Sequence, residues 1–471
     1  MNKTKVVATI GPMSLTKDTI KKMIEAGVDV FRINLKHASR DFCIKAKEMI
    51  DKVNKELKTN VAIMFDTKGP QVRVGMFAGG EAIYEANDKI RIYMDDVLGD
   101  STKFSVDYKD LLDEINFDTI IKFHDSNVEL QVLDKGNDYL LCVVLHGGTL
   151  KNQQTLTAVG IKLNLPCISD EDEDDIRFAH DLNIDFICLS NVSSGEDILD
   201  GNDLLIELGN NHMGIVAKIE NERAINDIDN IINNSDGILI ARGDLGVEIP
   251  VERIPGIQKN IINKCHQDGK FSIVAVDIVI QDEEYDEPTR AEVSDVANAV
   301  LDGVDAIMLT GKTAKGIYPV ETVYTINRIL DEAELEVDYY SFMDKALRTE
   351  NKDISGVIAH NVASSAIHLN CKAIYAPTMT GYTARKISRF RPICPIIAAS
   401  PNADTVKSLQ LYFAVYPVLI HELRTFDKVI EAAKKTSQDV LDLNLNDKYI
   451  ITGGYPFRDV KHTNFMKIEE L

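Results

Sequence analysis

The chain has 471 residues, a length that corresponds to about three domains of ordinary size. Hydrophobic residues make up 45% and charged residues 27%, which excludes the weakly hydrophobic class of chains that stay disordered. Lys and Arg number 52 against 74 Asp and Glu, and the net charge of −22 disfavours nucleic acids and anionic membranes as partners. A small phosphate-bearing ligand stays possible, because basic groups in one cleft can reverse the potential locally.

Cysteine usage and the lack of long apolar runs indicate the compartment. The seven cysteines are scattered and include no C-x-x-C pair, so they predict neither a zinc site nor a disulfide framework. A reducing environment suits such a set of thiols. No stretch approaches the ~18 apolar residues of a membrane span, and the first residues lack a secretory signal. We therefore expect a cytoplasmic protein.

Short β-branched runs alternate with amphipathic helical stretches, as in parallel α/β folds. In the first unit, Thr16 is placed to cap a helix that buries Ile20, Met23 and Ile24, and Gly27 follows its end. The expected strands span residues 6–10, 30–33, 61–65, 185–189, 214–218, 237–241, 272–276 and 306–309. Eight such units predict a (β/α)8 barrel, whose active site lies at the carboxyl ends of the strands.

Two further regions of the sequence differ from this alternation of strands and helices or follow it. We expect the catalytic barrel to comprise residues 1–69 and 166–342, with short alternating strands over 70–165 forming an inserted β-barrel lid domain. The insertion leaves from the end of the third barrel strand, which places it over the catalytic face. Residues 343–471 again alternate helices with strands and predict an open α/β domain.

Charged side chains gather where the fifth and sixth expected strands end. The segment A-K-I-E-N contains Lys218 and Glu220, which lie on one side of a strand because they are two residues apart. The segment A-R-G-D-L-G adds Asp244 on a glycine-rich turn. Two carboxylates beside a lysine suit a divalent ion such as Mg2+ or Mn2+ that also binds a small anionic ligand. A plain salt bridge at the barrel rim is the alternative.

The ends of the second and third strands supply a second charged set. It consists of Arg32, Asn34, Lys36 and His37 in R-I-N-L-K-H, and of Asp66, Thr67, Lys68 and Arg73 in D-T-K-G-P-Q-V-R. Both strands end at the same mouth of a barrel. We therefore expect these side chains to face the same cavity as Lys218.

These motifs, taken in order, resemble the pyruvate kinase family. The resemblance rests on F-R-I-N-L-K-H, F-D-T-K-G-P-Q-V-R-V-G, K-I-E-N, I-L-I-A-R-G-D-L-G-V-E-I-P and P-T-R-A-E-V-S-D-V-A-N-A-V-L-D-G-V-D-A-I-M-L-T-G-K-T-A-K-G, and it covers essentially the whole chain. It implies phosphoryl transfer between phosphoenolpyruvate and ADP in the barrel mouth, with Mg2+ or Mn2+ as cofactor. It also implies a homotetramer.

The resemblance assigns roles residue by residue. Lys218 matches the catalytic lysine, which neutralises charge on the phosphoryl group and the enolate, and Glu220 and Asp244 match the Mg2+ ligands. The remaining matches are Arg32, Gly243 and Asp244 on the substrate, Asn34, His37 and Arg73 on the nucleotide phosphates, and Asn34, Asp66 and Thr67 at the potassium ion. Such a set suits phosphoryl transfer, which depends on positioned cations more than on covalent help.

Several substitutions fall on this chemistry. Lys36 stands where the family has a potassium-binding serine, so we expect its ammonium, about 3 Å from Asp66, to replace the ion, unless it points to solvent. In A-V-D-I-V-I, Val276 and Asp277 replace the family's threonine and glutamine, and a valine cannot donate a hydrogen bond. Gln154 replaces a lysine near the nucleotide.

These losses leave three functions open. The first is a pyruvate kinase that does not require K+; the second is a non-catalytic or weakly active regulatory paralogue. The third is Mg2+-dependent decarboxylation of a 2-oxo acid such as oxaloacetate, which needs only the metal and Lys218 to stabilise the same enolate.

The loop T-M-T-G-Y-T resembles the family's sugar-phosphate effector loop. Thr378, Thr380 and Thr383 offer hydroxyls next to a helix start, but Met379 and Tyr382 stand where basic residues are usual. An ordinary capped turn is the alternative reading of this loop.

Overall fold

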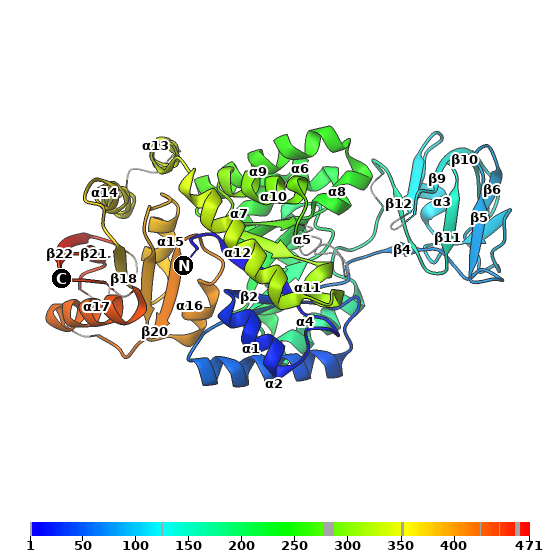
Figure 1. Cartoon of the computed structure of the whole chain (residues 1–471). Coiled ribbons are helices and arrows are strands. Elements are labelled where there is room, and N and C mark those ends of the chain that lie inside the picture. Colours follow the sequence, from blue (N-terminus) through cyan, green and yellow to red (C-terminus); the bar gives the residue numbers. More distant parts are fainter. Residues whose placement is uncertain are drawn as a thin grey trace.

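The computed structural model consists of a central barrel with a domain at either end (Figure 1). It describes residues 2–123, 126–161, 163–276, 287–349, 353–423, 425–441, 443–456 and 462–471. No helix in this described part is long and apolar enough to cross a membrane. All seven cysteines are free thiols, and each is buried except the half-buried Cys167.

Eight parallel strands close into the predicted barrel, in the order β1-β17-β16-β15-β14-β13-β3-β2. They are β1 (Lys5–Thr9), β2 (Val30–Asn34), β3 (Ala62–Asp66), β13 (Phe186–Leu189), β14 (Gly214–Ile219), β15 (Gly237–Ile240), β16 (Phe271–Val276) and β17 (Ala306–Leu309). Each lies within one residue of its expected bounds. The prediction of a (β/α)8 barrel is therefore confirmed.

Helices surround the barrel, and their ends follow local capping rules. Thr16 accepts a hydrogen bond from the backbone N of Thr19 at 3.1 Å, and Gly27 has a φ of 110°, so the first helix begins and ends as predicted. Apart from three helices at the mouth, the barrel helices are α1 (Lys17–Glu25), α2 (Arg40–Leu57), α4 (Asp170–Asp181), α5 (Gly195–Glu207), α7 (Ile228–Asn234), α9 (Ile254–Asp268), α10 (Arg290–Leu301) and α12 (Pro319–Leu335). The short α6 (Glu222–Asn226), α8 (Arg242–Glu248) and α11 (Gly311–Lys315) follow strand ends near the mouth.

The lid is a separate β domain with its own apolar core. Its seven-stranded sheet has the order β4-β12-β8-β9-β10-β6-β7, with β11 and β5 paired beside it. The elements are β4 (Val72–Arg73), β5 (Glu81–Tyr84), β6 (Lys89–Tyr93), β7 (Lys103–Ser105), α3 (Leu111–Glu114), β8 (Ile120–Phe123), β9 (Glu129–Lys135), β10 (Tyr139–His146), β11 (Gly148–Lys151) and β12 (Thr155–Ala158). Figure 1 shows the lid at the opposite end of the barrel from the carboxy-terminal domain.

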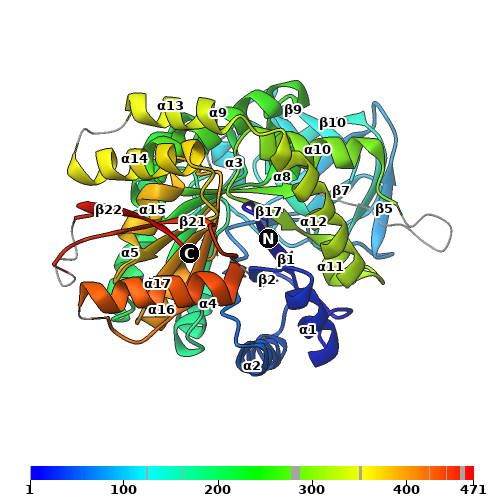
Figure 2. The same cartoon turned by 60° about the vertical axis from the view of Figure 1, so that its left-hand side comes forward.

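The carboxy-terminal domain is an open five-stranded sheet of order β20-β19-β18-β21-β22. Its elements are α13 (Tyr339–Thr349), α14 (Ile354–His368), β18 (Ala373–Pro377), α15 (Tyr382–Ser388), β19 (Ile396–Ser400), α16 (Ala403–Ser408), β20 (Val415–Leu419), α17 (Phe426–Leu441), β21 (Lys448–Gly453) and β22 (Phe465–Glu470). Helices α14 and α15 pack on one face and α17 on the other, as the turned view in Figure 2 shows. The antiparallel β22 was not expected from the sequence.

This domain is attached to the amino-terminal end of the barrel, away from the mouth. One apolar cluster runs from the barrel interior into the sheet domain and includes Phe186, Phe271 and Tyr412. Beside it, the guanidinium of Arg391 lies 2.6 Å from the carboxylate of Asp305, and both side chains are almost fully buried. The barrel mouth and the attached carboxy-terminal domain therefore lie at opposite ends of the same strands.

Candidate active site

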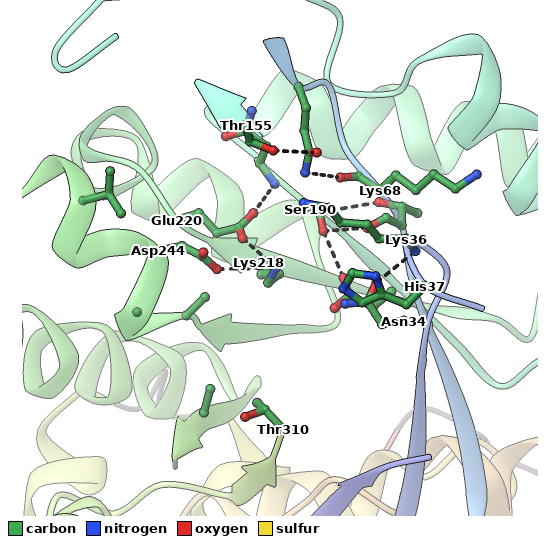
Figure 3. A pocket seen from close by; sticks show the side chains of 18 of the residues that line it. Asn34, Lys36, His37, Lys68, Thr155, Ser190, Lys218, Glu220, Asp244 and Thr310 are labelled. Atoms are coloured by element: carbon green, nitrogen blue, oxygen red, sulfur yellow. Dashed lines mark hydrogen bonds and ion pairs between the residues drawn. The ribbon is translucent and has the colours of Figure 1, made fainter. Parts of the chain in front are cut away.

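A pocket of about 620 Å³ lies at the carboxyl ends of the barrel strands, beneath the lid (Figure 3). Its barrel wall includes Arg32, Asn34, Lys36, His37, Asp66, Thr67, Ser190, Lys218, Glu220, Gly243, Asp244, Val276 and Thr310. Its lid wall includes Gln71, Val72, Thr155, Leu156, Thr157, Ala158, Ile161 and Leu163. The two charged sets at the strand ends thus share one cavity.

Lys218 lies between two carboxylates at the ends of neighbouring strands. Its Nζ is 2.5 Å from Glu220 Oε1 and 3.7 Å from Asp244 Oδ2. Glu220 Oε2 accepts a hydrogen bond from the backbone N of Asn191 at 2.6 Å, which fixes the carboxylate. Lys218 lies on β14 and Glu220 directly after it, while Asp244 lies in the first turn of α8, where the sequence had suggested a glycine-rich turn. These three side chains come together as the sequence predicts.

The charge balance of this trio depends on burial. Burial by itself would lower the pKa of Lys218, but the carboxylates of Glu220, Asp66 and Asp244 more than offset it and raise that pKa. Lys218 is therefore an ammonium at neutral pH. Burial and the adjacent Asp244 raise the pKa of Glu220 to about 7, although Lys218 acts in the opposite direction.

These carboxylates fit the divalent metal that the resemblance implies. Glu220 and Asp244 are close enough to share a hydrogen bond, so one cation can reach both. Within the described residues no group of three or more His, Cys, Asp or Glu side chains is placed to hold a metal. Mg2+ is commonly bound by one or two carboxylates, with substrate oxygens and water completing its octahedron. The donor set of this pocket matches that pattern.

Arg32 is held deep in the pocket wall by a second network. Its Nε donates to Asp66 Oδ2 at 2.8 Å, its Nη1 donates to Thr9 Oγ1 at 3.1 Å, and its Nη2 also contacts Asp66. The Ser190 hydroxyl donates to Asp66 Oδ1 at 2.9 Å and also contacts the carbonyl O of Thr67 at 2.9 Å. Both carboxylate oxygens of Asp66 therefore have partners, and the guanidinium is fixed in orientation.

The residues at the expected potassium position line the same pocket. Asn34 Oδ1 accepts a hydrogen bond from the backbone N of Lys36 at 3.0 Å, and the Lys36 side chain is exposed. Asp66 and Thr67 are buried. Figure 3 shows Lys36, Asn34 and His37 at the same side of the cavity.

Some predicted residues lie away from the pocket. Arg73 belongs to β4 of the lid and does not line the cavity; its backbone N donates to Asp107 Oδ1 at 2.7 Å. Gln154 Oε1 accepts from the backbone N of Lys151 at 2.6 Å, outside the lining. Val276 lines the pocket, while Asp277 lies outside the described residues.

Some polar groups of the loop at 378–383 form hydrogen bonds within the carboxy-terminal domain. Thr383 is 6% exposed and its Oγ1 lies 2.9 Å from Thr463 Oγ1, while the carbonyl O of Thr380 accepts from Arg385 Nη1 at 3.0 Å. Gly381 has a φ of 80°, which places a left-handed residue at the helix start. Thr378 forms a backbone hydrogen bond to the carbonyl O of Ala399 at 2.9 Å.

Sequence reasoning missed two residues of the pocket. Ser190 holds Asp66 and Thr67 in place, and Asn191 fixes Glu220 through its backbone. Both follow β13, so reading the end of every expected strand would have selected them.

The matches to known protein families agree with the division into a barrel and a carboxy-terminal domain. Residues 1–323 match the description of the pyruvate kinase barrel domain, and residues 357–469 match the pyruvate kinase alpha/beta domain. A pyruvate kinase of Staphylococcus saprophyticus is 39% identical over 470 residues, covering 99% of this chain and 80% of the relative. A pyruvate kinase of Clostridium perfringens is 35% identical over 475 residues, covering both chains completely.

A solved structure shows the same fold throughout. The crystal structure of a pyruvate kinase from Cryptosporidium parvum superimposes with a TM-score of 0.94 at 33% identity, covering 100% of this chain and 96% of that chain. The barrel, the lid, the sheet domain and the motifs at the strand ends all agree with this relationship. This chain belongs to the pyruvate kinase family.

Proposed function

We propose that this chain transfers the phosphoryl group of phosphoenolpyruvate to ADP, giving pyruvate and ATP. The observation that carries the proposal is the Lys218 ammonium between Glu220 and Asp244, in a pocket that also contains the fixed guanidinium of Arg32. Two cations and a pair of metal-binding carboxylates suit a substrate that has both a carboxylate and a phosphate.

Each residue has a defined task in this proposal. Arg32 holds the phosphate of phosphoenolpyruvate, and Lys218 lies beside the bridging oxygen, where negative charge grows as the P–O bond breaks. Glu220 and Asp244 would hold Mg2+, which supplies charge neutralisation for the phosphoryl oxygens. The transferred phosphorus forms a bond to the terminal phosphate oxygen of ADP, and the enolate left behind takes a proton at its methylene carbon to become pyruvate.

Val276 affects the last of these steps. Its side chain lines the pocket at the end of β16 but can neither donate nor accept a hydrogen bond. The proton for the enolate must therefore come from another group or from water. We expect enolate protonation, and not phosphoryl transfer, to limit the rate.

We further propose that the enzyme does not require K+. Arg32 already neutralises Asp66, and the exposed Lys36 adds a positive charge to the lining of the same pocket. A monovalent cation beside these charges would be repelled. Activity in potassium-free buffer should equal that in 100 mM K+ within about twofold, whereas marked stimulation by K+ would contradict this proposal.

The proposal extends to the assembly and its setting. Large apolar side chains are exposed on α12 to α14, including Leu335, Ile354 and Tyr340 at 76%, 66% and 52% exposure, and such residues favour contact with another copy of the chain. Family membership favours a homotetramer as the assembly. The seven free thiols suit the cytoplasm. Sedimentation equilibrium at several concentrations tests the tetramer, and a monomeric mass throughout would refute it.

A coupled assay separates the three functions. Purified protein is incubated with phosphoenolpyruvate, ADP and Mg2+, and pyruvate and ATP are followed together; the same preparation then receives oxaloacetate alone. Equal amounts of pyruvate and ATP from the first mixture support the proposal. Pyruvate from oxaloacetate only would indicate a decarboxylase, and no product from either, with Mg2+ still bound, would indicate a non-catalytic paralogue.

A further inference from the structure

The lid is joined to the barrel by two chain segments, and one buried carboxylate contacts both. The outgoing segment passes through Lys68 and Gly69, and the returning segment passes through Ser169 before α4 begins. Asp172, in the first turn of α4, is 1% exposed and lies between these segments. It is thus placed at the base of the lid.

The two oxygens of Asp172 divide their hydrogen bonds between the segments. Oδ1 accepts from the backbone N of Lys68 at 3.0 Å and of Gly69 at 3.1 Å, residues that precede it by 104 and 103 positions. Oδ2 accepts from the backbone N of Ser169 at 3.2 Å and from its hydroxyl at 2.7 Å. One carboxylate therefore binds both the segment that enters the lid and the segment that returns from it.

Neighbouring contacts hold the outgoing segment against the same helix turn. Lys68 Nζ lies 2.6 Å from Glu171 and 3.1 Å from Asp175, so its side chain points toward α4 and not into the pocket centre (Figure 3). Gly69 has a φ of 69°, and a Cβ there would lie 3.0 Å from the Cβ of Ser190. The backbone at this point is therefore determined by close packing as well as by hydrogen bonds.

Asp172 forms more hydrogen bonds than it needs to cap its own helix. The matching residue of α5, Asp197, accepts from the backbone N of Ser193 at 2.7 Å and of Ser194 at 2.9 Å, both directly before its own helix. Asp172 caps α4 in the same manner with Oδ2 alone. Its Oδ1 serves the remote segment at Lys68 and Gly69.

We propose that Asp172 is a positioning residue that forms the pivot of the lid. The inference rests on the proposed function, because the lid has to close over the nucleotide. Four hydrogen bonds to one carboxylate keep the two segments together while the lid turns about Gly69. The lid wall formed by Thr155 and Thr157 then returns to the same place over the barrel mouth in every cycle.

Asp172→Asn tests the pivot, with Asp197→Asn as the matched control. An amide keeps one accepting oxygen but turns an NH2 group toward one pair of donors. We expect the KM for ADP to rise about tenfold, with kcat reduced less than about threefold and the KM for phosphoenolpyruvate unchanged, because the barrel charges stay in place. Hydrogen exchange at the amides of Lys68 and Gly69 should quicken about tenfold or more.

The control decides between a pivot and a cap. Asp197→Asn removes the same kind of helix cap, so it should leave the KM for ADP and the two amides unaffected. An equal rise in KM for ADP in both variants would overturn the proposal, and so would unchanged exchange at Lys68 and Gly69 in Asp172→Asn.

Two further measurements cover a variant that does not fold and a wild-type protein that is inactive. If Asp172→Asn does not fold, Ser169→Ala removes one of the four donors and should shift the KM for ADP in the same direction by a smaller factor; no shift would refute the pivot. If the wild-type protein forms no pyruvate, the proposed function fails, while hydrogen exchange still decides whether Asp172 holds the segments.

Discussion

The two walls of the pocket differ in charge. The barrel wall contains Arg32, Asp66, Lys218, Glu220 and Asp244, whereas the described residues of the lid wall are uncharged. Those lid residues are Pro70, Gln71, Val72, Thr155, Leu156, Thr157, Ala158, Ile161, Leu163 and Leu165. The charges that act on a phosphoryl group thus come from the rigid part of the molecule, where strand ends fix their positions. The lid lies over the site and, in the proposed function, closes to exclude water.

This division has a physical reason. Electrostatic stabilisation requires charges that are already oriented, and Lys218 and Arg32 are each fixed by carboxylates on strands or strand ends. A side chain on a moving lid has to be repositioned in every cycle. The contrast predicts large effects for substitutions in the barrel wall and small ones in the lid wall.

The largest effect is expected for Lys218→Met, which removes the ammonium between the two carboxylates. We expect kcat to fall by about 10³-fold or more, since the charge that develops on the bridging oxygen is then uncompensated. The measurement is the initial rate of pyruvate formation at saturating substrates. Lys218→Arg is the control that keeps a positive charge. A fall in kcat of less than tenfold in the Met variant would contradict the expected difference between the barrel wall and the lid wall.

Next comes a substitution at the other end of the barrel, which separates stability from catalysis. Asp305→Asn leaves the Arg391 guanidinium buried without its counter-charge, which should cost about 3 kcal/mol of unfolding free energy. Urea unfolding measures this loss. The kinetic constants should change less than about twofold, because only charges at the mouth act on substrate; a large fall in kcat of the folded variant would contradict that.

The same pair predicts a pH dependence of stability. Burial would raise the pKa of Asp305, but Arg391 more than offsets it and lowers that pKa below its ordinary value. The stabilisation is therefore present above the unfolded pKa of about 3.9 and is lost as the pH falls through the folded pKa. The difference in unfolding free energy between wild type and Asp305→Asn should thus be full at pH 7 and should shrink below pH 4, and urea unfolding at both pH values measures it.

A third, smaller effect is expected for Glu220→Gln, which keeps an oxygen ligand but removes one negative charge. The Mg2+ concentration for half-maximal activity should rise about 10- to 100-fold. Titration with Mg2+ at fixed substrate concentrations measures it. An unchanged requirement would show that the metal is held elsewhere.

The smallest effect should come from the lid wall. Thr157→Ala removes a hydroxyl from a surface that has no charge to lose, so kcat and the KM for ADP should each change less than about threefold. A loss comparable to that of Glu220→Gln would show that the lid takes part in the chemistry and would remove the distinction between the two walls.

The sequence predicted the parts of this molecule that depend on local rules. The strands of the barrel could be found because each is a short buried run, and the mouth residues because parallel strands end at one edge. Thr16 and Gly27 were identified from capping preferences alone. The trio of Lys218, Glu220 and Asp244 followed from the same rules.

Contacts between remote segments could not be predicted in this way. Ser190, after β13, contacts Asp66 at the end of the neighbouring strand β3, and Arg391 of the carboxy-terminal domain contacts Asp305 of the barrel. In the sequence, Asp172 looks like an ordinary helix-capping residue, and its contact with Lys68 is not visible. Each depends on tertiary packing that no local pattern records. Strand β22 was missed because its alternation of apolar and charged residues is short and lies at the chain end.

The most direct test of the account follows the phosphorus atom itself. Purified protein is mixed with phosphoenolpyruvate, ADP and Mg2+ without added potassium, and 31P NMR records the products. If the chain transfers the phosphoryl group, the phosphoenolpyruvate signal is replaced by the γ-phosphate signal of ATP, in step with pyruvate formation, and Lys218→Met abolishes both. Phosphoenolpyruvate that persists beside folded, Mg2+-binding wild-type protein would contradict it.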